Sequence, residues 1–169
     1  MERQAAKTTL KMRGEVIAEL RDKHGNLKQR SVTHNIVTSQ GDKFAAAAMY
    51  TAAYTGWGMK LGTATTAASK SGAGSYIATA DYVSGSAKAL DDGTPKAGAT
   101  NDIVQFRRLW AAGEGTSSNI NRVAITDNTT DAGEADETHT FAISVFSSAI
   151  NKGASDTLAV TWNVTFLGA

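Results

Sequence analysis

The stretch 156–167, with the sequence DTLAVTWNVTFL, decides the fold class. Every second residue in it is apolar, and the residues between are small or polar. Strict alternation with a period of two is typical of a long β-strand with one buried and one wetter face. The apolar positions are Leu158, Val160, Trp162, Val164 and Phe166, and the alternate positions are Ala159, Thr161, Asn163 and Thr165. Since the printed sequence ends at Ala169, we expect an antiparallel β-fold that closes on this strand.

The composition narrows the class of protein. A length of 169 residues suits one domain, 1–169, and is enough to bury a core without disulfides. Cysteine is absent, which excludes a thiol nucleophile and cysteine-based metal sites. The net charge of +1 gives no global attraction to nucleic acid or membranes. Because there is no apolar run of about 18 residues and no apolar signal region, we expect neither a membrane span nor a leader.

A β-hairpin is predicted near the start of the chain. Residues 8–20 (TTLKMRGEVIAEL) alternate between an apolar and a charged face, with Ile17 as the exception. The faces are Leu10, Met12, Val16, Ala18 and Leu20, against Lys11, Arg13, Glu15 and Glu19. The turn signal Lys23-His24-Gly25-Asn26 then precedes a second run, 27–37 (LKQRSVTHNIV). Two alternating runs around such a turn favour a hairpin.

One short helix is predicted over residues 40–54. Ser39 is a candidate N-cap, and Asp42 three residues later resembles a capping box. The alanine-rich centre, KFAAAAMYTAAY, favours a helix. Its apolar stripe, which we expect to cover one end or face of a sheet, consists of Phe44, Ala47, Ala48 and Thr51.

The remaining elements are short strands and one long insertion. Residues 62–101 are rich in Gly, Ala, Ser and Thr and are too long for an ordinary loop. We interpret them as an extended excursion that either is ordered against a neighbouring subunit or forms an internal loop. Further strands are predicted at 57–61, 103–110, 121–126 and 138–146, with Phe141, Ile143 and Val145 on one face, and a turn at 150–153. About seven strands and one helix, without βαβ alternation, predict a mainly β fold, an antiparallel β-sandwich or jelly roll.

Candidate metal and phosphate sites are weak. His24, His34 and His139 lack the spacing of a helical zinc site, so we expect them to be surface or hydrogen-bonding residues. The run 127–131 (DNTTD) is similar to a calcium loop but lacks its glycine and closing glutamate. Two glycine clusters, Gly56, Gly58 and Gly62 and then Gly72 and Gly74, are interpreted as turn glycines because no phosphate-loop lysine follows.

No pattern predicts an enzyme, and we expect no catalytic, cofactor-binding or metal-ligating residues. Ser84-Gly85-Ser86 is not a nucleophile elbow and is interpreted as part of a linker. Arg107, Arg108 and Trp110 form a basic and aromatic cluster that either stacks on nucleic acid or sugar, or places a core tryptophan beside rim arginines. We favour the second interpretation, so nucleic acid is not an expected partner. Trp57 and Trp162 are likewise expected in the core.

Charge is distributed unevenly. Residues 1–30 hold eight Lys or Arg against four Asp or Glu. The segment 127–137 holds no Lys or Arg and five acidic residues, Asp127, Asp131, Glu134, Asp136 and Glu137. The two regions either pair between neighbouring subunits or are separate solvated surfaces.

Three motifs in order resemble small virion structural proteins of tailed bacteriophages. They are His34-Asn35-Ile36-Val37-Thr38 followed by Gly41, then 60–67 (KLGTATTA), then 150–152 (INK) leading into 158–166 (LAVTWNVTF). The family pattern has a glycine where Ala64 stands here. The resemblance spans most of the chain outside the insertion 62–101, and its motifs are structural rather than catalytic.

The resemblance implies a virion protein assembled in the host cytoplasm, most specifically a capsid decoration or cement protein. Such a protein would form a homo-oligomer, with a trimer favoured, and bind the major capsid protein by buried contacts and strand augmentation. The expected contact segments are an N-terminal arm, 1–9, and the insertion 62–101. Alternatives are a tail component (fibre, adaptor or baseplate subunit) and a carbohydrate-binding β-sandwich using Trp57 or Tyr76.

Overall fold

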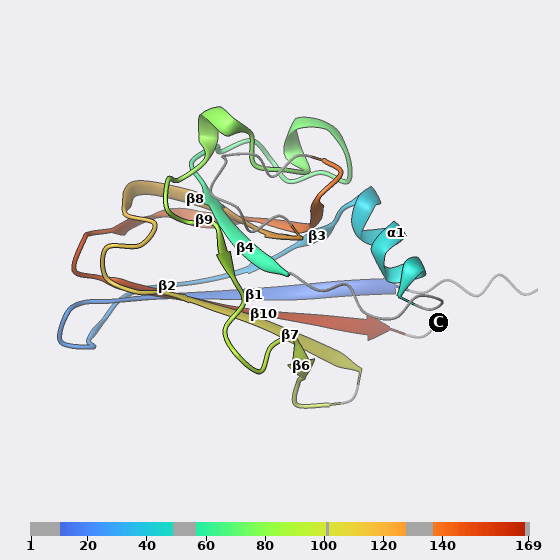
Figure 1. The fold of residues 1–169 in the computed structure, drawn as a ribbon, viewed down its shortest axis with the longest axis horizontal. Coiled ribbons are helices and arrows are strands. Elements are labelled where there is room, and N and C mark those ends of the chain that lie inside the picture. Colours follow the sequence, from blue (N-terminus) through green and yellow to red (C-terminus); the bar gives the residue numbers. More distant parts are fainter. Residues whose placement is uncertain (1–10, 49–56, 101, 128–136, 168–169) are drawn as a thin grey trace, which may run out of the picture.

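Two five-stranded sheets lie face to face in the computed structural model (Figure 1). The structure describes residues 11–48, 57–100, 102–127 and 137–167. Sheet A, the lower layer in Figure 1, has the order β2-β1-β10-β7-β6, and sheet B, the upper layer, has the order β3-β9-β8-β4-β5. All neighbouring strands are antiparallel. The predicted fold class, a mainly β antiparallel sandwich with one short helix, is confirmed.

The strands of sheet A are β1 (Lys11–Arg21), β2 (Leu27–His34), β6 (Lys96–Ala97), β7 (Ile103–Trp110) and β10 (Thr157–Leu167). The strands of sheet B are β3 (Ile36–Val37), β4 (Gly58–Gly62), β5 (Lys88–Ala89), β8 (Ser117–Thr126) and β9 (Thr140–Lys152). The helices are α1 (Ser39–Ala47) and two 3-10 turns, η1 (Gly72–Gly74) and η2 (Thr79–Asp81). The predicted N-terminal arm, 1–9, lies outside the described residues.

The alternating stretch that decides the fold becomes the middle strand of sheet A. β10 pairs with β1 on one side and with β7 on the other. Its predicted apolar face is buried, with Leu158, Val160, Trp162 and Val164 all at 0 % exposure. The β1–β2 hairpin is also confirmed, and Gly25 in its turn has a φ of +86°, a conformation that glycine adopts without steric cost.

The second arm of the hairpin does not continue as one strand. The prediction of a single run over 27–37 is wrong, because the chain leaves sheet A after His34 and joins sheet B as β3. Asn35 makes the crossing, and its backbone N–H donates to the carbonyl of Gly14 at 3.2 Å. A Cβ on Gly14 would lie 1.7 Å from Oδ1 of Asn35, so the crossing requires glycine at this position.

Helix α1 begins one residue earlier and ends earlier than predicted. Its N-cap is Thr38, not Ser39, and the Thr38 hydroxyl accepts a bond from the N–H of Gly41 at 2.9 Å. That hydroxyl also donates to the carbonyl of Thr140 at 2.5 Å, which anchors the helix on β9. Only Gly41 and Phe44 of the helix are buried, so the alanine run beyond them gains little from packing. Residues 49–54 of the predicted helix lie outside the described residues.

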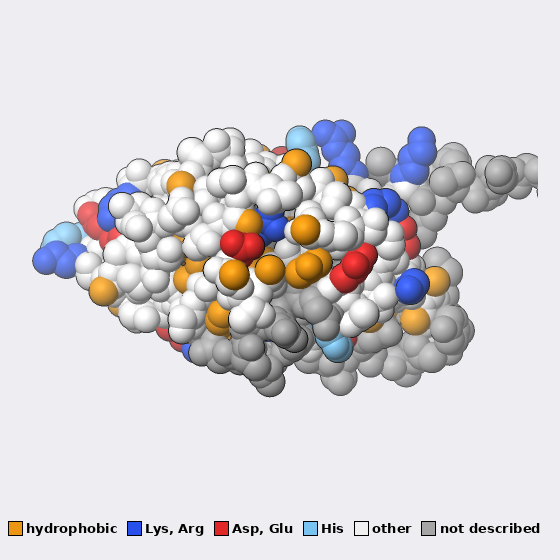
Figure 2. Space-filling model, turned by 90° about the horizontal axis from the view of Figure 1, so that it is seen from above, with side chains coloured by type: hydrophobic (Ala, Val, Ile, Leu, Met, Phe, Trp, Pro, Cys, Tyr) orange, Lys and Arg blue, Asp and Glu red, His pale blue; other side chains and the backbone are white. Residues whose placement is uncertain are grey.

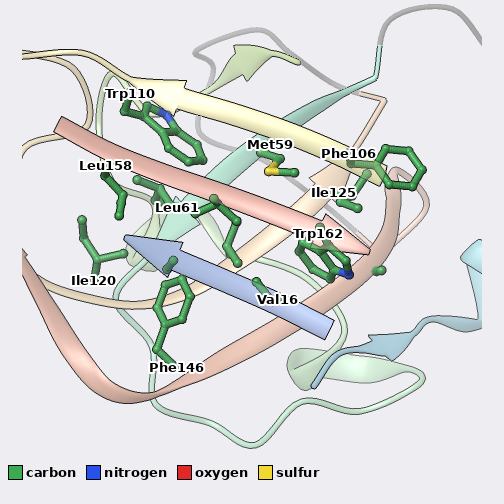
Figure 3. Close-up of a cluster of buried hydrophobic side chains, with 14 of the residues drawn as sticks. Val16, Met59, Leu61, Phe106, Trp110, Ile120, Ile125, Phe146, Leu158 and Trp162 are labelled. Carbon is green, nitrogen blue, oxygen red and sulfur yellow. The ribbon is translucent and has the colours of Figure 1, made fainter. Parts of the chain in front are cut away.

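The main core lies between the two sheets (Figure 3). Sheet A contributes side chains from β1, β7 and β10, and sheet B contributes side chains from β4, β8 and β9. The residues labelled in Figure 3 are Val16, Met59, Leu61, Phe106, Trp110, Ile120, Ile125, Phe146, Leu158 and Trp162. Trp110 and Trp162 are the largest of the fully buried side chains, which confirms that these tryptophans belong to the core.

The predicted common face of β9 is wrong. Phe141 packs in the main core, whereas Ile143 packs with Ile77 and Ala124 in a second cluster on the other side of sheet B. The pairing of β8 with β9 shifts register between Ile125 and Thr126, and such a bulge reverses which side chains face inward. β9 also continues to Lys152, so the predicted turn at 150–153 begins later.

The glycine- and alanine-rich insertion packs on its own sheet. Residues 63–87 cover the outer face of sheet B, as Figure 1 shows above β4, β8 and β9. Ile77 of this segment is 0 % exposed in the second cluster, and Val83, at 4 % exposure, reaches the main core. Within the described residues, 62–100 therefore contribute side chains to the core.

Side chains join sheet A to sheet B at the edges of the sandwich. At one edge β2 runs beside β9, where Thr33 and Ser144 share a hydroxyl hydrogen bond of 2.7 Å. Gln29 donates to the Ser148 hydroxyl at 3.2 Å further along the same edge. Side-chain hydrogen bonds therefore hold the β2 edge of sheet A against β9 of sheet B.

Candidate interaction surface

The outer face of sheet A is a regular surface formed by the outward side chains of β1, β2, β7 and β10. It is formed by cross-strand rows, since residues paired in register share a face. One row runs Val32, Ile17, Thr161 and Arg107, and the next runs Arg30, Glu19, Ala159 and Leu109. We call this surface the sheet A face; it comprises Ile17, Glu19, Leu27, Arg30, Val32, Gln105, Arg107, Leu109, Ala159, Thr161 and Asn163.

The exposed large hydrophobic residues concentrate on this face. Among the described residues, the large hydrophobic side chains that are exposed are Leu27 at 49 %, Val32 at 42 % and Leu109 at 38 %. All three belong to the sheet A face. Single exposed apolar residues are ordinary, but their gathering on one sheet face is a feature of interaction surfaces.

A shallow trough runs along β10 in the middle of the face. It forms because β10 presents the short side chains of Ala159 and Thr161, while the flanking strands present long ones such as Arg30 and Arg107. The trough has a volume of about 330 Å³ and is open to solvent. Such a shallow and open surface suits contact with another protein rather than the enclosure of a small molecule, and its lining is mostly polar.

The charged groups of the face are already paired. Glu19 accepts from Arg21 at 3.0 Å and lies 3.6 Å from Arg30. Gln105 donates to the side-chain oxygen of Asn163 at 3.0 Å. Arg107 is held by an ion pair with Asp91. Since desolvating an unpaired charge is costly, this pairing lowers the cost of covering the face with a partner.

The opposite side of the molecule has a different character. Figure 2 looks down on the segment that covers sheet B, and uncharged polar side chains and backbone dominate that view. A group of hydrophobic side chains lies near its middle, and most charged side chains lie towards its rim. The three large exposed hydrophobic residues identified above belong to the sheet A face instead.

The Arg107, Arg108 and Trp110 cluster is not a stacking platform. Trp110 is 0 % exposed, and its indole N–H donates to the carbonyl of Ser86 at 2.8 Å. Arg108 donates to Glu114 at 3.1 Å and lies 3.7 Å from Asp91. The structure thus contains a core tryptophan beside arginines at the rim. The arginines join β7 to Asp91 and Glu114 at the second edge of the sandwich.

Glu114 is the acceptor that organises this second edge. Its carboxylate accepts the backbone N–H of Ala111 at 3.0 Å and lies 3.1 Å from Lys88. The Ala111 N–H, together with Lys88 and Arg108, lowers the pKa of Glu114. These contacts keep the Glu114 carboxylate ionised, and its role is to hold Ala111, Lys88 and Arg108 together.

The two aromatic residues considered for sugar binding are half-buried. Trp57 packs edge-on against Phe44, Phe106 and Phe141, with ring centroids 5.6, 6.3 and 5.4 Å away. This cluster lies where α1 meets the end of the sandwich. The carbonyl of Tyr76 accepts from Arg122 at 3.0 Å, which places Tyr76 in the covering segment of sheet B.

The histidines lie at separate places. His24 is in the β1–β2 turn, His34 ends β2 beside Arg13, and Nδ1 of His139 lies 2.7 Å from Asp127. Among the described residues no group of three or more His, Cys, Asp or Glu could hold a metal ion. The rest of the acidic run 128–136 lies outside the described residues.

The glycine and serine motifs are structural where they are described. Ser86 is fully buried, and its hydroxyl accepts the backbone N–H of Leu61 at 3.0 Å, so interpreting 84–86 as a linker is wrong. Gly62 lies close to Ile77, and Gly74 lies close to the carbonyl of Ala67. Gly72 has a φ of +72°, which confirms a turn glycine there.

Sequence reasoning missed three buried cations. Lys60, Arg122 and Lys152 are 0 %, 1 % and 0 % exposed. Arg122 donates to the carbonyls of Ala64 and Tyr76 at 3.1 and 3.0 Å. The sequence signal for Arg122 was its position inside a largely apolar strand, INRVAIT. A charged side chain in such a strand is expected to be buried with its neighbours.

Comparison with known proteins gives no relative: no family model, no curated protein and no solved structure matches this chain. Among the described residues, no helix is long and apolar enough to cross a membrane.

Proposed function

We propose that this chain is a structural protein of a tailed-bacteriophage particle, and most specifically a capsid decoration protein. Its activity is adhesion: the sheet A face docks on the outer surface of the major capsid protein and bridges neighbouring copies. The three sequence motifs that resemble small virion proteins support the particle assignment. The observation that carries the adhesive role is the gathering of Leu27, Val32 and Leu109 on one face whose charges are already paired.

The roles of the motif residues in the fold agree with a structural protein. Asn35 makes the sheet crossing, Thr38 caps and anchors α1, and Gly41 allows α1 to approach the carbonyl of Phe141. Trp162 fills the core opposite Gly14. These residues maintain a rigid scaffold, and a rigid face loses little conformational entropy when it docks.

The interface would gain its free energy from apolar burial. Covering Val32 and Leu109 together with Ile17 and Ala159 removes apolar surface from water, at about 25 cal/mol per Å². An interface of standard size buries about 800 Å² on each partner, so each copy needs either a second contact or an oligomer to hold firmly. We propose a homo-oligomer, with three copies favoured, because several weak contacts on one shell combine into tight binding.

Copy number in purified particles tests this proposal. Quantitative mass spectrometry would measure the ratio of this chain to the major capsid protein in the same preparation. A ratio near one supports decoration of the whole shell. A handful to a few dozen copies in each particle would instead assign the chain to a tail, fibre or adaptor position, and absence from the particle would overturn the virion proposal.

A further inference from the structure

The start of β1 has an open backbone edge. β2 pairs with β1 only from Glu15 onward, because the chain crosses to sheet B at Asn35. The carbonyl of Gly14 points to this side, where it accepts the N–H of Asn35. In an antiparallel strand the N–H and C=O groups of one residue point to the same side of the strand. The groups of a residue two positions away point to that side as well. Met12 therefore presents both groups on the edge that no described strand pairs.

A groove lies along this open edge. Lys11, Met12 and Arg13 form one wall, and the crossing segment with Asn35 and Ile36 forms the other. The groove has a volume of about 490 Å³ and adjoins a hollow of about 310 Å³ beside Gly14 and His34. Met12 and Ile36 are half-buried, so the floor is apolar while the rim is charged.

Buried polar groups without partners in the described part of the chain lie in the core beside Gly14, next to the groove. Both polar atoms of the Asn35 side-chain amide and the indole N–H of Trp162 are buried, and none has a hydrogen-bond partner among the described residues. A Cβ on Gly14 would lie 1.7 Å from Oδ1 of Asn35 and 3.0 Å from Nε1 of Trp162, which places both groups against Gly14. Because these atoms are already buried, they mark a locally unsatisfied end of β1 and do not themselves contact the groove.

The charge of the rim selects the kind of ligand. Lys11, Arg13 and Lys70 line the groove with a single carboxylate, Asp42, which is paired with Lys70. Lys11 has no ion pair within the described residues, and Arg13 contacts only the ring of His34 there, at 3.5 Å. Within the described part of the chain, the groove therefore carries two cations without a carboxylate partner, Lys11 and Arg13.

We propose that this groove binds an extended acidic segment of a partner protein, which adds to β1 as a short strand. Backbone N–H and C=O groups of the segment pair with those of Met12, as in other cases of strand addition. Its apolar side chains cover Met12 and Ile36, and its carboxylates meet Lys11 and Arg13. This surface is separate from the sheet A face, so this inference and the proposed function can fail independently.

Fluorescence anisotropy with a labelled peptide tests the inference on the full chain. The probe is the peptide Asp-Val-Asp-Thr-Asp-Val-Asp-Thr, with two comparison peptides: one with Lys in place of every Asp, and one N-methylated at two consecutive central residues. We expect saturable binding of the acidic probe, and binding at least about tenfold weaker for both comparison peptides. N-methylation removes backbone donors without changing charge, so it separates strand addition from charge attraction alone.

Two charge-reversal variants complete the test. K11E/R13E should weaken binding of the acidic probe at least about tenfold, while K23E/K96E, which reverses two exposed lysines elsewhere, should leave it unchanged. No saturable binding up to about 1 mM, equal binding by K11E/R13E, or equal binding of the N-methylated probe would overturn the inference. Self-association of the chain that K11E/R13E abolishes would assign the groove to a second copy and overturn the assignment to a partner protein.

Discussion

Arg122 in β8 donates from Nη1 to the carbonyl of Tyr76 at 3.0 Å, across 46 residues of sequence. The same guanidinium donates to the carbonyls of Ala64 and Thr66. One side chain thus supplies three of the hydrogen bonds that hold the residues between Ala64 and Tyr76 on sheet B. Burial lowers the pKa of Arg122, with the charge of Asp81 opposing that effect, and the group stays charged at neutral pH.

Replacing Arg122 by Met should destabilise the protein by about 3 kcal/mol, because three buried carbonyls lose their donor. The free energy of unfolding in urea measures this loss. Hydrogen exchange should show the greatest loss of protection in residues 63–82. The control R30M changes an arginine that is 49 % exposed and should cost below about 0.5 kcal/mol. Equal costs for the two variants would contradict the role assigned to Arg122.

Replacing Gly14 by Ala should cost about 2 kcal/mol, because the new Cβ collides with Oδ1 of Asn35. Shortening Asn35 to Ala removes the colliding atoms, so in the N35A background the same change should cost below about 1 kcal/mol. Urea denaturation of the wild type, both single variants and the double variant gives the coupling between the two positions. Additive costs would show that Asn35 does not occupy the space above Gly14.

Stability should depend on pH through Asp156. Its Oδ2 lies 2.7 Å from the ammonium of Lys28 and also accepts the N–H of Gly153 at 2.8 Å. The Lys28 hydrogen bond, followed by the Gly153 N–H, lowers the pKa of Asp156. A carboxylate with a lowered folded-state pKa contributes stability above its unfolded value of about 3.9 and loses it as the pH falls through the folded-state pKa.

The variant D156N should therefore be less stable than the wild type from pH 7 to 5, and the difference should shrink below about pH 4. Chemical denaturation at pH 7, 5 and 3 measures it. K28M, which removes the leading cause of the shift, should reproduce part of the loss at pH 7. A difference between the wild type and D156N that stays constant down to pH 3 would contradict the assignment.

Replacing Trp57 by Ala should cost about 3 kcal/mol, because the ring packs against Phe44, Phe106 and Phe141. L27A, at a residue 49 % exposed, is the matched surface control and should cost below about 0.5 kcal/mol. Thermal unfolding separates the two. If W57A kept full stability yet lost saturable binding to a glycan, Trp57 would be a ligand platform and not a packing residue.

Alternation with a period of two was sufficient to predict β1 and β10, because each has one face in the core and one in water. It was not sufficient for β2 and β3, since the pattern continues unbroken through His34 and Asn35 while the chain changes sheets. The sheet change depends on the space above Gly14, a tertiary contact that no local pattern encodes. The bulge near Thr140 places Ile143 on the outer side of sheet B. It likewise depends on tertiary contacts that no local pattern encodes.

The covering segment and the sheet A face show a second limit. β8 is buried on both faces because residues 63–87 cover it, so Arg122 lies in the interior although arginine is normally a surface residue. The three exposed hydrophobic residues of the sheet A face come from different strands. Leu27, Val32 and Leu109 come together only once the register of β1, β2, β7 and β10 is known.

Binding of the variant V32R/L109R to empty shells of the major capsid protein tests the adhesive role most directly. Both side chains are exposed, so the variant should unfold within about 0.5 kcal/mol of the wild type. Co-sedimentation should recover the wild type at a ratio near one copy per capsid protein and the variant at a background level. Equal co-sedimentation of a folded V32R/L109R variant would contradict the sheet A face as the docking surface.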